Sequence, residues 1–195
     1  TDGQIYLDPG LFDKGILPAI DLRISVSRVG DKAQLAPMRD VAKKLKIEYE
    51  HFLEVEVFTK FGAKLDEETL KILRRGERLR EILRQDRFRP MQVEEQVATF
   101  YAHGQGSLDD IETAGVWPFI EAYLEELRLQ APDVLEEIRE GLTLSTKMKS
   151  RLDKAIKKVS RKERGDDIEQ GTGWQEKELP VDTGDCQSDE GPLGG

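Results

Sequence analysis

The sequence predicts a mainly α protein: a helical bundle that follows a few short strands and precedes a disordered acidic tail. Three observations lead to this prediction. Apolar residues recur every three or four positions through the middle of the 195-residue chain, which is typical of amphipathic helices. Short β-branched segments separated by turn residues occupy the beginning of the chain. From residue 165 onward, acidic and small polar residues dominate, and such a composition does not offset the entropy of folding.

Residues 1–36 are expected to form two or three short strands. One candidate covers residues 5–7 and another covers residues 24–29, with turn signals at residues 8–10 and at Gly30. A few strands of this length do not make a stable sheet by themselves. We therefore expect them to complete a sheet whose other strands lie elsewhere.

Helical periodicity begins after Pro37. The first stripe starts at Met38 and predicts one long helix that ends before Gly62. Asp66 is placed to cap a second helix, which Pro90 separates from a third helix that starts near residue 93. Glycines at 104 and 106 end the third helix.

The remaining periodic segments predict three more helices. One runs over residues 116–130, and Pro132 ends it before a short segment that carries Leu135 and Ile138. Ser145 is placed to cap the last helix, whose apolar stripe contains Met148 and Ile156. Stripes of this kind are typical of a helical core rather than of cofactor contacts.

Charge is distributed unevenly along the chain. The net charge of −9 argues against nucleic-acid binding by the chain as a whole. Nine basic residues nevertheless gather in residues 147–164, and nine acidic residues face only Lys177 in residues 165–195. These two blocks are expected to attract one another. The basic helix is a candidate for nucleic-acid binding, but it lacks interleaved aromatic residues, and the acidic tail would compete with phosphate.

Metal and membrane chemistry have little support in the sequence. Cys186 is the only cysteine, which excludes an intrachain disulfide and a thiolate cluster. His51 and His103 have no third ligand at metal spacing, so we predict no metal site and expect both at the surface. No apolar run approaches 18 residues, so we expect membrane association only through partners.

Arg28 is the residue that most directly points to chemistry. It lies at the end of the β-branched run that starts at Ile24, with only Val29 between it and the turn at Gly30. A guanidinium held in this way suits the charge that develops in a phosphoryl transfer, and an ordinary ion-paired surface arginine is the alternative. A nucleotide hydrolase also needs a G-x-x-x-x-G-K-[ST] loop, and these residues contain none. The chain alone is therefore expected not to hydrolyse ATP.

Several blocks occur in one order and closely resemble the alpha subunit of F-type rotary ATP synthases. The blocks are residues 1–7, 15–21, 25–30, 33–34, 65–66, 75–79, 82–85, 90–91 and 93–97. The resemblance covers roughly residues 1–155. It implies that residues 1–36 are the end of a truncated α/β nucleotide-binding domain of RecA type, and that residues 37–164 are the helical domain that follows it. We accordingly expect the chain to be a fragment of a longer polypeptide, with a disordered acidic tail at residues 165–195.

The resemblance also implies roles for individual residues. In the family, regulatory alpha subunits alternate with catalytic beta subunits, and the arginine that matches Arg28 reaches the nucleotide bound by beta. Ser25 matches a position important for activity and is expected to hold the strand and turn. Gly3 matches a small residue near the phosphate end of that interface. Gln85 matches a glutamine on the adenine side of the nucleotide that alpha itself binds, and Arg87 stands where another glutamine is frequent.

The cofactor and partners follow from the same resemblance. They are ATP or ADP with Mg²⁺, bound mostly by upstream residues, together with beta subunits, the gamma central stalk and the peripheral stalk. The implied location is the cytoplasmic face of a prokaryotic inner membrane, reached through the complex, with no nucleic-acid partner.

Two departures from the family pattern leave alternatives open. Asp31 replaces a small residue and could pair with Arg28, and Arg23 stands where the family tends to have glycine. The driving ion is accordingly a proton or sodium, and the alternate N-type branch remains possible. A different class also remains, namely a free-standing helical interaction module whose acidic tail recruits basic partners.

Overall fold

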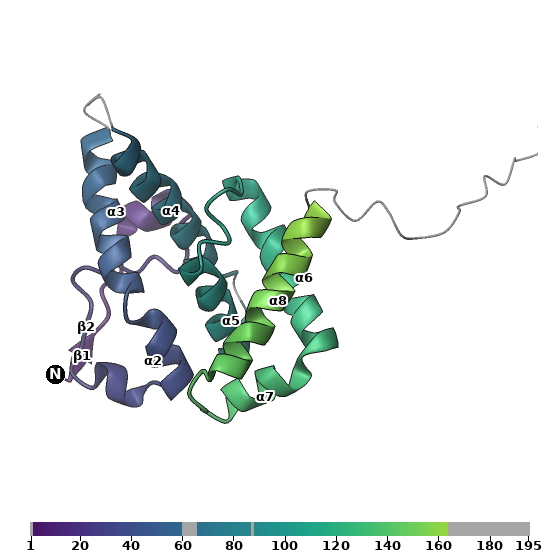
Figure 1. Ribbon diagram of the computed structural model, residues 1–195. Helices are drawn as coiled ribbons and strands as arrows, with labels where there is room; N and C mark the ends of the chain where they lie inside the picture. Colours follow the sequence, from purple (N-terminus) through teal and green to yellow (C-terminus); the bar gives the residue numbers. More distant parts are fainter. Residues whose placement is uncertain (1, 60–65, 87, 164–195) are drawn as a thin grey trace, which may run out of the picture.

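The computed structural model describes residues 2–59, 66–86 and 88–163 (Figure 1). The predicted acidic tail, Arg87 and the helix end expected at Gly62 lie outside these residues. The described part is mostly helical, with one short sheet near the beginning, so the predicted mainly α class is confirmed. In the part that the structure describes, no helix combines the length and the apolar character that crossing a membrane requires.

The two strands form a short antiparallel pair. A short helix and a loop connect them, and for brevity we call the pair and Arg28 after it the hairpin. β1 (Gly3–Gln4) pairs with β2 (Val26–Ser27), and Gly3 lies opposite Ser27. β2 falls inside the predicted strand at residues 24–29, whereas β1 precedes the predicted strand at residues 5–7, of which Leu7 makes an isolated bridge to Ile20. A 3₁₀ turn, η1 (Gly30–Ala33), follows β2.

The turn expected at residues 8–10 is instead the start of a short helix, α1 (Pro9–Asp13). Asp8 caps it, because its carboxylate accepts a hydrogen bond from the backbone N–H of Gly10 at 2.7 Å. Proline at the first helical position suits this arrangement, since the missing N–H has no partner there in any helix.

The prediction of one long helix after Pro37 is wrong. The segment forms α2 (Ala36–Ala42) and α3 (Leu45–Thr59), separated by a turn at Lys43 and Lys44. α2 packs against α5 (Val93–Gly104), and α3 packs against α4 (Glu67–Leu83). One apolar stripe therefore serves two different neighbours, and the chain turns between them.

The other helices confirm the sequence predictions. α4 begins after Asp66, whose carboxylate accepts a hydrogen bond from the Thr69 N–H at 2.8 Å. η2 (Thr113–Gly115) leads into α6 (Val116–Gln130), and α7 (Pro132–Arg139) follows directly. α8 (Thr146–Glu163) is capped by Ser145, which accepts a hydrogen bond from the Met148 N–H at 3.2 Å.

The core is built around α5, which contacts α2, α6, α7 and α8 (Figure 1). Large side chains with no exposed surface come from most of the helices. They include Phe52, Leu79, Val97, Phe119, Ile120, Leu127, Ile138 and Leu152. Because α5 is covered on several sides, even its polar residues Glu94, Thr99 and His103 are buried.

The expectation that both histidines lie at the surface is half wrong. His51 is exposed on α3, but His103 is fully buried, and its Nε2 lies 2.9 Å from Oε1 of Glu48. The sequence shows one apolar stripe on α5, whereas the fold surrounds the helix. A histidine outside that stripe is therefore enclosed together with a carboxylate partner.

Candidate functional site

The Arg28 side chain stands at the end of β2 on an exposed edge of the molecule. Its backbone N–H donates to the carbonyl of Asp2 at 2.9 Å, which anchors the residue. Its guanidinium Nη1 lies 3.3 Å from Oδ1 of Asp2, and the two side chains are 74% and 87% exposed. An exposed ion pair of this kind contributes at most about 1 kcal/mol, so another anion could replace Asp2 at little cost. The carboxylate beside Arg28 is Asp2 rather than Asp31.

Ser25 connects three segments of the N-terminal region. Its hydroxyl accepts a hydrogen bond from the Tyr6 N–H at 3.1 Å and donates one to the carbonyl of Asp21 at 2.5 Å. The side chain thereby holds the chain after β1 against the turn that precedes β2. This contact supports a positioning role for Ser25 in the hairpin that carries Arg28.

Asp21 is a structural carboxylate below this hairpin. It is 9% exposed and lies 3.1 Å from the guanidinium of Arg23. The hydrogen bond from Arg23 is the main reason that the pKa of Asp21 lies below its usual value, and burial opposes this effect. Arg23, which departs from the family pattern, therefore neutralises a buried charge next to Ser25.

Gly3 is required by the approach of the two strands. A Cβ added there would lie 2.8 Å from the carbonyl oxygen of Val26 and 3.2 Å from the Cα of Ser27. Any larger residue would push β1 away from β2 and shift the strand that ends at Arg28. Gly3, Ser25 and Arg28 thus belong to one hairpin, which gives the three predicted residues a common structural context.

Apolar side chains around this hairpin are exposed. They are Ile5, Leu7, Ile24, Val26 and Val29, each more than half exposed. A concentration of apolar surface in one small region is typical of a surface that meets another protein segment.

Gln85 lies in a different place, just after α4. Its backbone N–H donates to the carbonyl of Leu17 at 2.9 Å, and its side-chain amide lies 3.4 Å from the carbonyl of Arg89. The residue lines a hollow of about 430 Å³. The other lining residues are Leu17, Pro18, Asp86, Phe88, Arg89 and Pro90. Neither Arg28, Ser25 nor Gly3 lines it, and Arg87, the other residue predicted here, lies outside the described residues.

Phe88 is a lining residue that the sequence reasoning missed. Its side chain is 98% exposed, and its backbone has a φ of 62°. A bulky residue in the left-handed region is uncommon, and such conformations cluster at functional sites. No sequence pattern signals it, because Phe88 belongs to no apolar stripe and precedes no glycine.

The charged groups of the described residues offer no evident metal site. No group of three or more His, Cys, Asp or Glu side chains comes together within residues 2–59, 66–86 and 88–163. The chemistry available at the two predicted places is therefore that of a guanidinium at the hairpin and of an amide with apolar walls at the hollow.

Comparison with known proteins identifies the helical part. The family model described as ATP synthase alpha/beta chain, C terminal domain, matches residues 34–159. The chain belongs to this family. The matched range contains α2 to α7, most of α8 and Gln85 itself. The Arg28 hairpin and two lining residues of the hollow, Leu17 and Pro18, lie before it.

Two curated relatives of this ATP synthase family extend the match. The ATP synthase subunit alpha of Salinibacter ruber is 56% identical over 140 residues, which cover 72% of this chain and 25% of that protein. The ATP synthase subunit alpha of Petrotoga mobilis is 45% identical over 158 residues, which cover 81% of this chain and 31% of that protein. The predicted resemblance to the C-terminal region of the alpha subunit is confirmed. The aligned part of this chain spans only about a quarter to a third of the length of these relatives.

Proposed function

We propose that this chain acts as the C-terminal part of the non-catalytic alpha subunit of a rotary ATP synthase. In this proposal Arg28 is offered in trans to the phosphate groups of a nucleotide held by a beta subunit. The observation that carries it is the exposed and weakly paired guanidinium of Arg28, mounted on a hairpin whose backbone is firmly hydrogen-bonded. The match to alpha subunits supports the same proposal.

The chemistry of Arg28 is electrostatic. A guanidinium remains charged at any physiological pH and presents a rigid set of donors, so it can stabilise negative charge that spreads over phosphoryl oxygens. Exclusion of water at a subunit boundary strengthens this interaction. The exposed apolar side chains around the hairpin would supply that exclusion when the beta subunit covers them.

The Gln85 hollow fits the base end of a nucleotide. Leu17, Pro18 and Phe88 offer apolar surfaces for a planar ring, and the amide of Gln85 can donate to or accept from a base edge. The sequence contains no phosphate loop, so Mg²⁺ and the phosphates of ATP or ADP would be held by another part of the subunit. A bound nucleotide would supply a regulatory or structural contact here, and this chain would orient its base.

The wider setting follows from the same proposal. The helical bundle would meet the gamma central stalk and the peripheral stalk, and the complex would lie at the cytoplasmic face of a membrane. ATP synthesis would then be coupled to a proton or sodium gradient.

The decisive experiment replaces Arg28 in a full-length alpha subunit that carries this sequence and is co-expressed with beta. Arg28→Ala should leave assembly and nucleotide binding intact but lower steady-state ATP hydrolysis by about 10³- to 10⁵-fold, the range measured for arginine fingers. Arg39→Ala is the matched control, because Arg39 is exposed and makes one hydrogen bond, to the carbonyl of Gln34 at 3.3 Å. Unchanged hydrolysis by Arg28→Ala would refute the assignment. Failure of the unmodified subunit to assemble with beta would favour the free-standing interaction module.

The base-binding part of the proposal has its own test. A base stacked on an aromatic ring gains about 1 to 3 kcal/mol, so Phe88→Ala should weaken nucleotide retention by alpha by about tenfold or more. Phe58→Ala provides the control, because Phe58 is also exposed but lies on α3 outside the hollow. Equal retention by both variants would remove Phe88 from the site without affecting the role of Arg28.

A further inference from the structure

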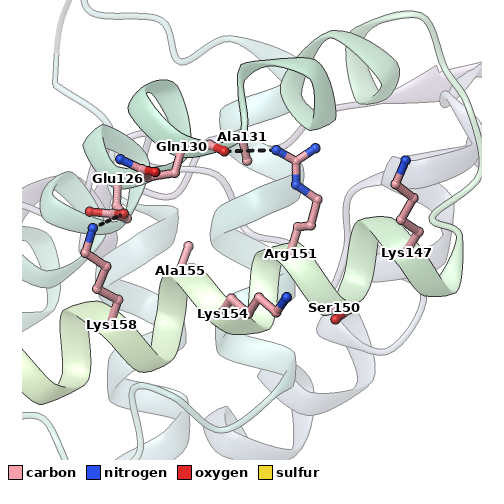
Figure 2. A pocket seen from close by; sticks show the side chains of 9 residues that line it. All are labelled: Glu126, Gln130, Ala131, Lys147, Ser150, Arg151, Lys154, Ala155 and Lys158. Atoms are coloured by element: carbon pink, nitrogen blue, oxygen red, sulfur yellow. Dashed lines mark hydrogen bonds and ion pairs between the residues drawn. The ribbon is translucent and has the colours of Figure 1, made fainter.

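A basic groove runs between α6 and α8, far along the chain from the residues considered above (Figure 2). Its volume is about 540 Å³. The lining residues are Glu126, Gln130, Ala131, Lys147, Ser150, Arg151, Lys154, Ala155 and Lys158. We call this the α6–α8 groove.

The cations of the groove lie along one side of α8. Residues 147, 151, 154 and 158 are three or four positions apart, so successive turns of the helix place their side chains on the same face. Arg161 and Lys162 continue the positive charge toward the end of α8 and are both exposed. The apolar face of the same helix, which carries Leu152, is turned into the core.

Two of these cations are already neutralised. Nζ of Lys158 lies 2.6 Å from Oε1 of Glu126, as the dashed line in Figure 2 marks. Arg151 pairs with Asp133 and donates to the carbonyl of Gln130 at 2.9 Å. These contacts hold the groove in shape.

The other two groove cations keep their charge available. Lys147 and Lys154 are exposed, and neither makes an ion pair with any residue that the structure describes. The groove therefore combines a shape held by Arg151 and Lys158 with unneutralised positive charge, which is a suitable surface for an anionic chain.

We propose that the acidic segment 165–195 of the same chain occupies the α6–α8 groove. The segment has nine acidic residues and a single lysine, so its charge is complementary to that of the groove. It also starts two residues after Glu163, at which α8 ends. The occupant is thus covalently attached at one end of its site.

The acidic segment is long enough to reach Lys154 and Lys147. A helix rises about 1.5 Å per residue, so Lys154 and Lys147 lie about 14 and 24 Å back along α8 from its end. An extended chain covers about 3.3 Å per residue, so about eight residues can return to Lys147. Tethering also gives the segment an effective concentration on the order of millimolar, which lets weak ion pairs hold it in place.

Cys186 allows a direct test without any added cysteine, because it is the only cysteine in the chain and lies in the acidic segment. A nitroxide attached to Cys186 should broaden the NMR signals of backbone amides that line the groove, at residues 126–131 and 147–158. The broadening should disappear in about 1 M NaCl, where the Debye length falls to about 3 Å. Broadening elsewhere on the molecule, or none at low salt, would overturn the proposal.

Charge variants locate the site. Lys147→Gln combined with Lys154→Gln should remove most of the broadening, with the far-UV circular dichroism unchanged because both side chains are exposed. Lys44→Gln combined with Lys71→Gln removes the same charge from exposed positions outside the groove and should leave the broadening as it is. Equal loss of broadening in the two double variants would show only general charge attraction and would refute the proposed site.

Two further experiments test whether something other than the chain's own acidic segment occupies the groove. In one, protein that carries the nitroxide but no ¹⁵N is mixed with ¹⁵N-enriched protein that carries no nitroxide. The amide signals should show no broadening, and broadening in this mixture would mean that the segment binds a second copy. A short RNA added to the spin-labelled protein should not displace the segment at low salt. Tight RNA binding in the groove, with no contact from Cys186, would make it a nucleic-acid site instead. These outcomes are independent of Arg28 and of assembly with beta.

Discussion

The ring of Phe52 on α3 packs directly against the backbone of Gly76 on α4. A Cβ added at Gly76 would overlap the Cβ, Cγ and Cδ2 atoms of Phe52, which is fully buried. The guanidinium of Arg80 covers the same ring at 4.5 Å from its centroid. Gly76 therefore permits the close approach of α3 and α4.

Gly76→Ala should destabilise the chain. Overpacking a close helix contact costs about 1 to 3 kcal/mol, which exceeds the gain of up to about 1 kcal/mol from alanine in a helix. Urea denaturation measures the difference. Gly104→Ala is the control, because no atom lies within 4 Å of a Cβ added there, and it should be neutral or stabilising. A Gly76→Ala protein as stable as the Gly104→Ala protein would contradict the packing argument.

Arg75→Lys should also destabilise the chain, because a lysine cannot reproduce the three-way contact of this arginine. Its Nε donates to Glu48 at 2.5 Å, Nη1 to Asp109 at 3.0 Å and Nη2 to the carbonyl of His103 at 3.0 Å. Loss of such charged hydrogen bonds costs about 1 to 3 kcal/mol in unfolding free energy. The neighbouring Arg74 is exposed, so Arg74→Lys should change the urea midpoint little. Equal urea midpoints for the two variants would show that the contacts of Arg75 do not contribute to the free energy of unfolding.

The ion pair between Glu94 and Arg139 should make stability depend on acid pH. Glu94 is 3% exposed and receives hydrogen bonds from Nε and Nη2 of Arg139 at 3.1 and 2.5 Å. Burial acts to raise the pKa of Glu94 and is the largest single effect. The hydrogen bond and charge of Arg139, together with a hydrogen bond from the backbone N–H of Glu94, outweigh it, so the pKa lies below its usual value. A lowered pKa stabilises the fold above the unfolded value of about 4.3, and this stabilisation is lost as the pH falls through the folded pKa.

The measurement for Glu94 is the urea midpoint as a function of pH. Glu94→Gln should be less stable than the unmodified chain at pH 7, and the difference should shrink below about pH 4. Glu136→Gln removes an exposed carboxylate that contacts the same arginine, so its midpoints should follow those of the unmodified chain. A Glu94→Gln deficit that stays constant with pH would rule out the ion pair as its cause.

Ser25→Ala should loosen the hairpin that carries Arg28. The variant loses the hydroxyl that joins the Tyr6 N–H to the carbonyl of Asp21, so hydrogen exchange at the Tyr6 amide should accelerate by up to about tenfold. Ser27→Ala alters the same hairpin at a hydroxyl that instead accepts from the Gly30 N–H at 3.0 Å. The exchange rate at Tyr6 should be unchanged in Ser27→Ala, and acceleration in both variants would argue against a specific role for Ser25.

The helices with sharp boundary signals were predictable. α6 covers the predicted residues because Pro132 ends the pattern directly after it, and α4 and α8 begin after the predicted caps Asp66 and Ser145. The separation of α2 from α3 was not predictable, since the apolar period continues without interruption through Lys43 and Lys44. The local sequence pattern indicates which face of a helix is apolar, but it does not indicate how many other helices pack against that face.

The candidate site also has features that could be predicted from the sequence and features that could not. The position of Arg28 after a strand and before a turn could be predicted, because β-branched residues and glycine act locally. Its pairing with Asp2 rather than Asp31 follows from the antiparallel pairing of β1 with β2, which brings together two side chains that are 26 residues apart in sequence. The exposed ring of Phe88 at the hollow depends on a left-handed backbone conformation that no sequence pattern signals.

The amino-acid sequence by itself determined the helical class, most helix ends, the family resemblance and the opposite charges of α8 and the segment that follows it. These properties depend on short-range periodicity, on caps and on composition. Only the tertiary structure decided that His103 is buried beside Glu48, that Gly76 must accommodate Phe52, and which cations of α8 are paired. Burial and ion pairing depend on residues brought together from distant parts of the chain, and packing rather than local preference selects those neighbours.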